Sequence, residues 1–547
     1  MPERNLQKSE ESELKDAIEL ILNSLSKKKL VIAGPGTGKT TIFKQLLTLA
    51  PGHPKERLVL TFINNLKNDL EKDLGELAQV STLHAYCLGL LYRYPALRGS
   101  LSHDFRCCPG LASLIAEDWK LIIGGDAPHF VSDMRTLAED NHISFYINRG
   151  NYYNAVDFDD TVFRAYQGLS SGISAVNNYE LILIDEFQDF NALEAGVIDI
   201  LAEHSSILIA GDDDQALYSQ LRNASWDHIR LLRNAGEYEV FPLPFCMRCP
   251  KVVVDAVNDI LAKANALEKL KGRIDKPYRH FPPVKGNDSI KYPKIVQVET
   301  SVQKQNVNYM GQYIAQDISR IPENEIKTAS QEGYPVALVI AAQPYRDHIV
   351  SYLENAGYYI NTRRNTNTKI IRDTGLLILK EDLTSNLGWR IIIDADSPAF
   401  LRDAIAATSN NETPLVKVIP TEYREKILKE INVYEHQSDI TTEEQTAPDE
   451  NHLTISVTSF EGAKGLSAQH VYIAGLHRGE LPHDTKLIKD LEICKFVVGL
   501  TRTRKKCTLI HTRNFAGKWK QPSCFLSWIN PEKFEHIKID AQYWKRK

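Results

Sequence analysis

A glycine-rich segment near the start of the chain has the spacing of a phosphate-binding loop. It comprises Ala33, Gly34, Pro35, Gly36, Thr37, Gly38, Lys39, Thr40 and Thr41, between an apolar stretch and a helix-forming stretch. Glycines let backbone N–H groups converge on a polyphosphate, and the helix N-terminus adds the positive end of its dipole. We expect Lys39 to reach the β- and γ-phosphates and Thr40 to bind Mg²⁺. Ala33 stands where the strict pattern has glycine; the alternative is a strand–helix turn that binds no ligand.

A second segment supplies the carboxylates that such a loop needs. The apolar run at residues 181–184 is typical of a buried parallel strand, and Asp185 and Glu186 follow it directly. Ligands bind at the carboxyl ends of strands in open α/β sheets. We expect Asp185 to hold Mg²⁺ and Glu186 to act as the general base toward the attacking water. An acidic turn without function is the alternative.

Further motifs follow in an order that is specific in combination. Gly211–Gln215 ends another apolar strand, and six more short motifs stand at Thr61–Asn65, Thr82–His84, Val156–Asp160, Leu243–Arg248, Gly462–Leu466 and Val497–Arg504. With the glycine-rich loop and the Asp185–Asp189 motif, this series resembles the UvrD/Rep/PcrA group of superfamily-one helicases from residue 33 to residue 504. The resemblance implies two tandem RecA-like P-loop domains of α/β class with parallel sheets, each carrying a mainly helical accessory insertion.

The resemblance also implies how the halves cooperate. ATP would lie between the two sheets, with Lys39, Asp185, Glu186 and Gln215 from the first half. Arg248 and Arg502 would come from the second half and neutralise charge on the γ-phosphate, and Arg502 is preferred over Arg504 for that role.

Contacts with a nucleic-acid strand are predicted less directly. Phe62, Asn64, His84, Tyr218 and Arg222 correspond to positions above the first sheet where single-stranded DNA would cross. The chain departs from the family pattern in four places: no aromatic residue follows Tyr218 at the usual spacing, Met247 replaces the tyrosine that packs on adenine, Glu461 and Ser467 replace a histidine and a glutamate, and Ile18 stands where a glutamine is expected. A base-stacking aromatic contributes about 1–3 kcal/mol per base, so strand binding here must use other groups.

These residues need a scaffold of at least two domains. We expect residues 1–91 and 178–238 to form the first RecA-like domain, and residues 92–177 its accessory domain. Residues 239–380 and 451–547 would form the second RecA-like domain, and residues 381–450 a reduced second accessory domain. A chain of 547 residues is long enough for this division.

Composition excludes several classes of protein. The net charge of −5 does not by itself indicate nucleic-acid binding, although a basic groove can lie on an acidic molecule. No apolar run approaches the ~18 residues of a membrane span, so a cytoplasmic protein without a membrane partner is expected. Eight cysteines are too few for a disulfide scaffold. Cys246 and Cys249 form a CxxC pair without a second pair at zinc spacing, so reduced thiols are expected.

The sequence thus predicts an ATP hydrolase: a DNA translocase and helicase with ATP and Mg²⁺ as cofactors and single-stranded or partly duplex DNA as partner. By resemblance it would move 3′ to 5′. One alternative is a DNA-sensing ATPase subunit that regulates a protein effector, because small UvrD-like subunits of antiviral phage-defence systems such as Gabija resemble this plan. The second alternative is a nucleotide-binding scaffold that does not hydrolyse ATP.

Overall fold

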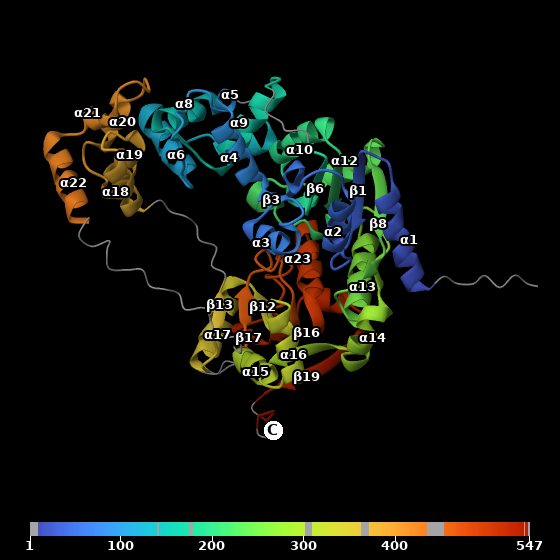
Figure 1. Cartoon of the computed structure of the whole chain (residues 1–547). Helices are drawn as coiled ribbons and strands as arrows, with labels where there is room; N and C mark the ends of the chain where they lie inside the picture. Colours follow the sequence, from blue (N-terminus) through green and yellow to red (C-terminus); the bar gives the residue numbers. More distant parts are fainter. Residues whose placement is uncertain are drawn as a thin grey trace, which may run out of the picture.

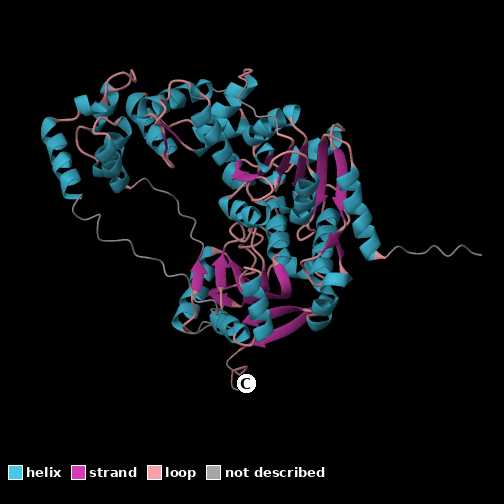
Figure 2. Ribbon diagram, viewed as in Figure 1, coloured by secondary structure: helices cyan, strands magenta, loops and turns pink. Residues whose placement is uncertain are grey.

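The computed structural model describes residues 9–138, 142–173, 179–300, 309–362, 371–434, 453–540 and 542–544. It contains two large parallel β-sheets, each covered by helices, and a group of helices that lies to one side of the first sheet (Figures 1 and 2). The expected α/β class with two parallel sheets is confirmed.

The first sheet has six parallel strands in the order β3-β2-β6-β7-β1-β8. Alternate residues of β1 belong to different cores: Leu30 and Ile32 pack on one face, whereas Val31 and Ala33 pack on the other. This double burial explains the uninterrupted apolar runs in the sequence. The strands are β1 (Lys28–Ala33), β2 (Arg57–Thr61), β3 (Gln79–Thr82), β6 (Leu181–Ile184), β7 (Ile207–Gly211) and β8 (Glu239–Leu243).

Strand β8 corrects one expected boundary. We expected the second domain to begin near residue 239, but Lys29–Ala33 of β1 pairs in parallel with Glu239–Leu243. Strand β8 lies at the edge of the sheet, where the missing N–H of Pro242 is tolerated. The first sheet therefore extends to residue 243.

Helices cover the first sheet and, together with short loops, connect its strands. They are α1 (Glu10–Asn23), α2 (Lys39–Leu49), α3 (Asn64–Leu74), α4 (Leu83–Arg93), α10 (Ala192–His204), α11 (Ser219–Arg222) and α12 (Asp227–Ala235), with short 3₁₀ turns η1 (Pro54–Glu56), η2 (Phe187–Asp189) and η3 (Asp213–Gln215). Asn191 and Glu194 cap the start of α10 reciprocally, each side chain accepting from the other residue's backbone N–H.

The second sheet has seven parallel strands in the order β13-β14-β12-β15-β16-β11-β19. They are β11 (Ile295–Thr300), β12 (Ala337–Ala341), β13 (Ile360–Thr362), β14 (Ile455–Thr458), β15 (Ala468–Ala474), β16 (Thr503–Thr512) and β19 (Phe534–Ile539). Its helices are α13 (Lys251–Ala266), α14 (Pro282–Lys291), α15 (Tyr309–Ile318), α16 (Glu323–Gln331), α17 (Gln343–Asn355) and α23 (Asp490–Thr501). Minor elements complete this half: β9 (Phe245–Cys246), β10 (Arg279–His280), β17 (Asn514–Phe515), β18 (Lys518–Trp519), η4 (Cys524–Trp528) and η5 (Pro531–Lys533).

Two helical insertions interrupt the sheets. The first comprises α5 (Pro95–Arg98), α6 (Leu111–Ile122), α7 (Phe130–Thr136), α8 (Ile143–Tyr153) and α9 (Phe158–Ser170), with short strands β4 (Arg106–Cys107) and β5 (Ala155–Val156). The second comprises α18 (Arg372–Glu381), α19 (Asn386–Asp396), α20 (Leu401–Ala407), α21 (Leu415–Val418) and α22 (Thr421–Tyr434). Its helices begin at Arg372, before the expected boundary at 381, and its expected end at 450 lies outside the described residues.

The two insertions share one hydrophobic core, although they come from opposite halves of the chain. Asp118 of α6 is fully buried between two buried arginines. Its Oδ2 accepts from Nε of Arg149 at 2.8 Å, and its Oδ1 accepts from Nε of Arg390 at 2.8 Å. Arg149 also donates to the carbonyl of Thr408 at 3.0 Å. We call Asp118, Arg149 and Arg390 the accessory bridge.

Among the described residues, no helix is long and apolar enough to cross a bilayer.

Candidate nucleotide site and nucleic-acid face

The glycine-rich loop joins β1 to α2, as the sequence predicted. Gly36 and Gly38 adopt φ values of 74° and 91°, in the left-handed region that favours glycine. Space is also restricted, because a Cβ on Gly36 would lie 2.5 Å from Cβ of Arg248, and one on Gly38 would lie 2.4 Å from Cε of Met247. The hydroxyl of Thr37 donates to the carbonyl of Gly34 at 2.8 Å and fixes the turn. The loop thus presents backbone N–H groups at the start of α2.

The acidic pair lies directly opposite this loop. Asp185 and Glu186 follow β6, and Glu186 has a left-handed φ of 55°. The Lys39 ammonium lies 2.5 Å from Oε1 of Glu186 and 3.7 Å from Oδ1 of Asp185. Lys39 and Glu186 therefore neutralise each other's charge.

Burial and nearby charges shift the pKa values of the two carboxyl groups in opposite directions. Burial raises the pKa of Asp185 to about 6, against the opposing charge of Lys39. Burial would also raise the pKa of Glu186, but the ammonium groups of Lys39 and Lys464 hold it well below its usual range. Glu186 is therefore ionised at neutral pH, as a base must be.

Residues from both halves line one cavity of about 440 Å³ beside the loop. Its lining includes every residue that we predicted to be catalytic: Lys39, Asp185, Glu186, Gln215, Arg248 and Arg502, together with residues 35–41 of the glycine-rich loop. Ala33 and Gly34 are buried behind the loop and do not line the cavity. The structure brings the predicted ATP-site residues together from five separate segments of the chain.

The two halves meet through Arg502 and Gln215. Nη2 of Arg502 donates to Oε1 of Gln215 at 2.9 Å, across the cavity. Burial and the neighbouring charge of Arg248 lower the pKa of Arg502 to about 10. A cation that is costly to bury in this way is stabilised by an anion such as a phosphate. Arg504 also lines the cavity, but its guanidinium stacks on Tyr334 at 3.8 Å and donates to Oγ of Ser467 at 2.9 Å.

Lys464 is a site residue that our prediction did not include. It comes from the second half and is buried, and its ammonium donates to the carbonyl of Gln215 at 2.5 Å and forms an ion pair with Asp189. It also lies 3.7 Å from Oε2 of Glu186. The Gly462–Leu466 motif was the available signal, although its sequence did not show which side chain would cross to the first half.

The residues at the predicted Mg²⁺ position have side chains that suit this cation. Thr40 and Asp185 line the cavity together at the start of α2. Oδ1 of Asp185 is buried without a hydrogen-bond partner, so one carboxylate oxygen is available to a cation. A hydroxyl and a carboxylate beside bound phosphates are ordinary Mg²⁺ ligands.

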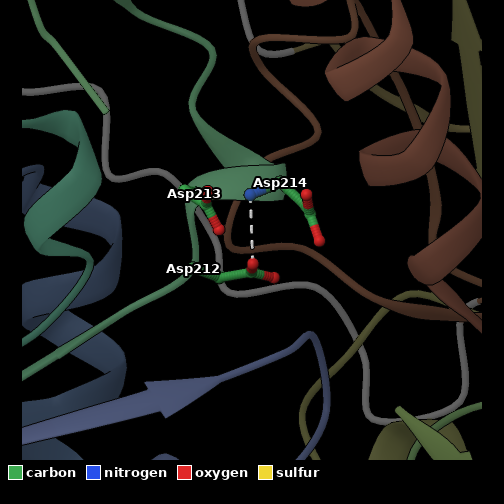
Figure 3. Close-up of side chains that lie close together, drawn as sticks. All are labelled: Asp212, Asp213 and Asp214. Atoms are coloured by element: carbon green, nitrogen blue, oxygen red, sulfur yellow. Dashed lines mark hydrogen bonds between the residues drawn. The ribbon is translucent and has the colours of Figure 1, made fainter. Parts of the chain in front are cut away.

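Three consecutive carboxylates after β7, from Asp212, Asp213 and Asp214, form a second acidic cluster (Figure 3). The buried Lys276 ammonium lies 2.7, 3.0 and 2.7 Å from them, in that order. This cluster is therefore occupied by a side-chain cation, and it attaches the segment after α13 to the first half.

The predicted nucleic-acid residues gather above the carboxyl ends of β2 and β3. Arg222 connects them: its guanidinium lies 4.5 Å above the ring of Phe62, and its Nη2 lies 3.0 Å from Nε2 of His84. Tyr218 packs against Phe62 with ring centroids 5.0 Å apart. Asn64 begins α3 and is exposed.

Phe62 itself is only 3% exposed, so its ring does not form an open platform for a base. Arg222 covers it instead. At the position where the family aromatic is missing, Leu221 is 58% exposed on the four-residue helix α11. Burial and the charge of Arg222 lower the pKa of His84 to about 3, so this imidazole is neutral.

Comparison with known proteins agrees with this site. Residues 15–220 match the family described as an AAA domain. The chain is 25% identical over 260 residues to the ATP-dependent DNA helicase SRS2 of Saccharomyces cerevisiae, which covers 36% of this chain and 22% of that protein. It is 21% identical over 625 residues to a probable DNA helicase II homolog of Mycoplasma pneumoniae, covering 92% of this chain and 84% of the relative. It is 24% identical over 285 residues to the ATP-dependent DNA helicase PcrA of Staphylococcus aureus, covering 44% and 39%.

Fold, site and relatives define a P-loop nucleotide-binding protein with two RecA-like sheets. Within that class, the chain is similar in sequence to proteins named as DNA helicases, in agreement with the resemblance to the UvrD/Rep/PcrA group. The aligned segments span about a fifth of the yeast relative and about two fifths of the staphylococcal relatives.

Proposed function

We propose that the protein is an ATP-dependent translocase and helicase that acts on single-stranded DNA. The observation that supports this most strongly is the single cavity at which Lys39 and Glu186 of one half meet Arg248 and Arg502 of the other. Such a site closes on a nucleotide and opens after hydrolysis, and this cycle can move two halves along a strand.

Hydrolysis would begin with the release of an ion pair. Lys39 is paired with Glu186 at 2.5 Å, and a γ-phosphate is the natural competitor for that ammonium. When Lys39 turns to the phosphate, Glu186 becomes free to accept a proton from water. Mg²⁺, held by Thr40 and Asp185, would neutralise part of the phosphate charge. Arg248 and Arg502 would stabilise the charge that develops in the transition state.

DNA binding would use Arg222 in place of the missing aromatic residue. Its planar guanidinium already stacks on one ring and can stack on a base through its other face. Phosphate contacts release counterions, so affinity should fall as salt rises. The 3′ to 5′ direction of movement follows from family resemblance.

A second candidate is a DNA-sensing ATPase subunit that controls a protein effector, with little unwinding of its own. The exposed Leu221 at the place of a base-stacking aromatic favours it, because a weak grip on bases impairs strand separation more than it impairs sensing. A nucleotide-binding scaffold without hydrolysis is the third reading, and the complete set of catalytic side chains opposes it.

The experiment measures ATPase activity with and without single-stranded DNA, and strand displacement on duplexes with a 3′ or a 5′ tail. The Lys39→Ala variant is the control, because it removes the phosphate-binding ammonium. We expect DNA-stimulated hydrolysis, absent in the variant, and displacement from the 3′-tailed duplex. Stimulated hydrolysis without displacement would favour the sensor, and absence of hydrolysis would favour the scaffold. Displacement only from the 5′-tailed duplex would reverse the polarity.

A further inference from the structure

Two cysteines lie beside the nucleotide cavity, and the proposed catalytic cycle does not use them. Cys246 ends β9, and Cys249 precedes Pro250, the N-cap of α13. Both side chains are buried. The backbone N–H of Cys249 donates to Sγ of Cys246 at 3.4 Å, so the chain turns back between the two residues. The thiol of Cys249 donates to the carbonyl of Thr501 at 3.5 Å.

This pair is in contact with both sides of the nucleotide site. A Cβ placed on Gly36 would lie 3.3 Å from Sγ of Cys246, so this sulfur lies directly against the backbone of the phosphate loop. Met247 and Arg248 stand between the two cysteines and line the cavity, and the N–H of Met247 donates to the carbonyl of Gly36 at 2.8 Å. Thr501, which accepts from Cys249, directly precedes Arg502.

The two thiols have opposite acidities. Burial would raise the pKa of Cys246, but the neighbouring Cys249 and Tyr278 side chains and backbone N–H groups lower it to about 6. Burial and the adjacent Cys246 sulfur raise the pKa of Cys249 well above its usual value. The other six cysteines also have raised pKa values: Cys87, Cys107, Cys108, Cys494, Cys507 and Cys524. A thiolate beside a neutral thiol is the usual arrangement of a reactive CxxC motif.

We propose that Cys246 and Cys249 form a redox modification site, at which hydrogen peroxide produces an intramolecular disulfide that inactivates the nucleotide site. The Cys246 thiolate attacks a peroxide oxygen, an S–O bond forms, the O–O bond breaks, and hydroxide leaves. The Cys249 sulfur then attacks Sγ of Cys246, the S–S bond forms, the S–O bond breaks, and water leaves with the Cys249 proton. The two sulfurs together lose two electrons, and the peroxide is reduced to one hydroxide and one water.

The consequence for activity rests on the proposed ATPase function. A disulfide ends the hydrogen bond from Cys249 to Thr501 and holds Met247 and Arg248 in a short covalent ring. Arg248 then cannot keep its present place against Gly36. Losing one positioned arginine in a phosphoryl-transfer site costs on the order of 10³ to 10⁵ in turnover, so displacement of Arg248 should lower turnover by about tenfold or more. A bound nucleotide should slow the oxidation, because it would restrain Met247 and Arg248, which line the cavity between the two cysteines.

The test treats the full-length protein with hydrogen peroxide, maps its peptides after differential alkylation, and measures ATPase activity in parallel. We expect a Cys246–Cys249 disulfide that forms more slowly with a non-hydrolysable ATP analogue. Activity should fall with disulfide formation and return on reduction. The Cys249→Ser variant keeps a hydroxyl that can donate to Thr501. In this variant, oxidation should produce no Cys246–Cys249 disulfide. It should stop at the sulfenic acid of Cys246, and a reductant should then restore activity. The matched control is Cys107→Ser, which removes a half-buried thiol of the first insertion and should behave like the parent protein.

Peptide mapping does not depend on activity, so the two proposals fail separately. If the reduced protein has no ATPase activity but the disulfide forms, the proposed function is wrong and the modification site stands. If no Cys246–Cys249 disulfide forms under peroxide, or if it forms without loss of nucleotide binding or hydrolysis, the proposal is overturned. Equal inactivation of a Cys246→Ala, Cys249→Ala double variant would place the oxidation elsewhere.

Discussion

At the scale of single residues, the position of Glu186 is held by lysines from both halves. Lys39 of the phosphate loop and Lys464 of the second half both lie within ion-pair distance of it. The first is available to a phosphate, whereas the second remains with Asp189 and Gln215. The base can therefore lose one counter-charge to the nucleotide and keep the other.

The two arginines near the end of α23 should differ in effect. Arg502→Ala should lower kcat by roughly 10³ or more and weaken ATP binding much less, because a buried guanidinium that faces the cavity acts on developing charge. Arg504→Ala is the matched control and should act mildly, since its guanidinium is held by Tyr334 and Ser467. Steady-state ATPase assays at saturating DNA measure both. If instead the Arg504→Ala variant is inactive and the Arg502→Ala variant is nearly normal, then Arg504 rather than Arg502 stabilises the transition state.

Glu194, beneath Arg222, should make stability depend on pH. Burial raises the pKa of its carboxyl to about 7, against the opposing charge of Arg222. The folded state therefore binds a proton more tightly than the unfolded state. Its stabilising contribution is complete below the ordinary pKa of about 4.3 and is lost as the pH rises through 7.

Glu194→Gln removes this titration and keeps an oxygen for the cap of α10. Relative to the parent protein, the variant should gain unfolding free energy as the pH rises across that interval, at up to about 1.4 kcal/mol per pH unit. Urea unfolding at several pH values measures the difference. Glu203→Gln, at an exposed position of the same helix, is the control and should follow the parent curve. A constant difference between Glu194→Gln and the parent protein would contradict the prediction.

At the scale of elements, the accessory bridge joins helices from two insertions. Asp118→Ala would leave Arg149 and Arg390 buried without their shared carboxylate, which costs about 3–5 kcal/mol. The second insertion should then separate from the first, seen as faster proteolysis near residues 371–434 and a lower melting temperature. Asp118→Asn keeps the shape and should have a smaller effect.

Asp394→Ala is the matched control for the bridge. Asp394 also pairs with Arg390, at 2.8 Å, but its side chain is half-exposed. An exposed pair contributes at most about 1 kcal/mol, so this variant should remain as compact as the parent protein. Equal protection of Asp118→Ala from protease would show that apolar packing alone joins the insertions.

The sequence predicted local features better than distant pairings. The loop at residues 33–41 and the acids after β6 were found because glycine spacing and an apolar run specify each of them locally. The pairing of β8 with β1 was missed, because an edge strand interrupted by Pro242 has no local pattern that names its partner. The burial of Phe62 was missed for the same reason: Arg222 and Tyr218 cover it from a segment more than 150 residues away.

At the scale of the whole molecule, the same limit applies to the contact between the insertions. Arg149 and Thr408 are 259 positions apart, and neither stands in a motif. The number of charged residues in the sequence could not show that Asp118, Arg149 and Arg390 are buried together. The motif order predicted two parallel sheets, which the structure contains, but the contact between the insertions became visible only in three dimensions.

The accessory bridge also changes how the molecule can move. The first half continues into the first insertion, the bridge joins that insertion to the second, the chain joins the second insertion to the second half, and the nucleotide cavity joins the two halves again. In mechanical terms, the accessory bridge makes the second insertion a passenger of the first, because Arg390 and Thr408 are held by Asp118 and Arg149. A rotation of the first insertion against its sheet therefore moves the second insertion with it for as long as Asp118 keeps its two arginines.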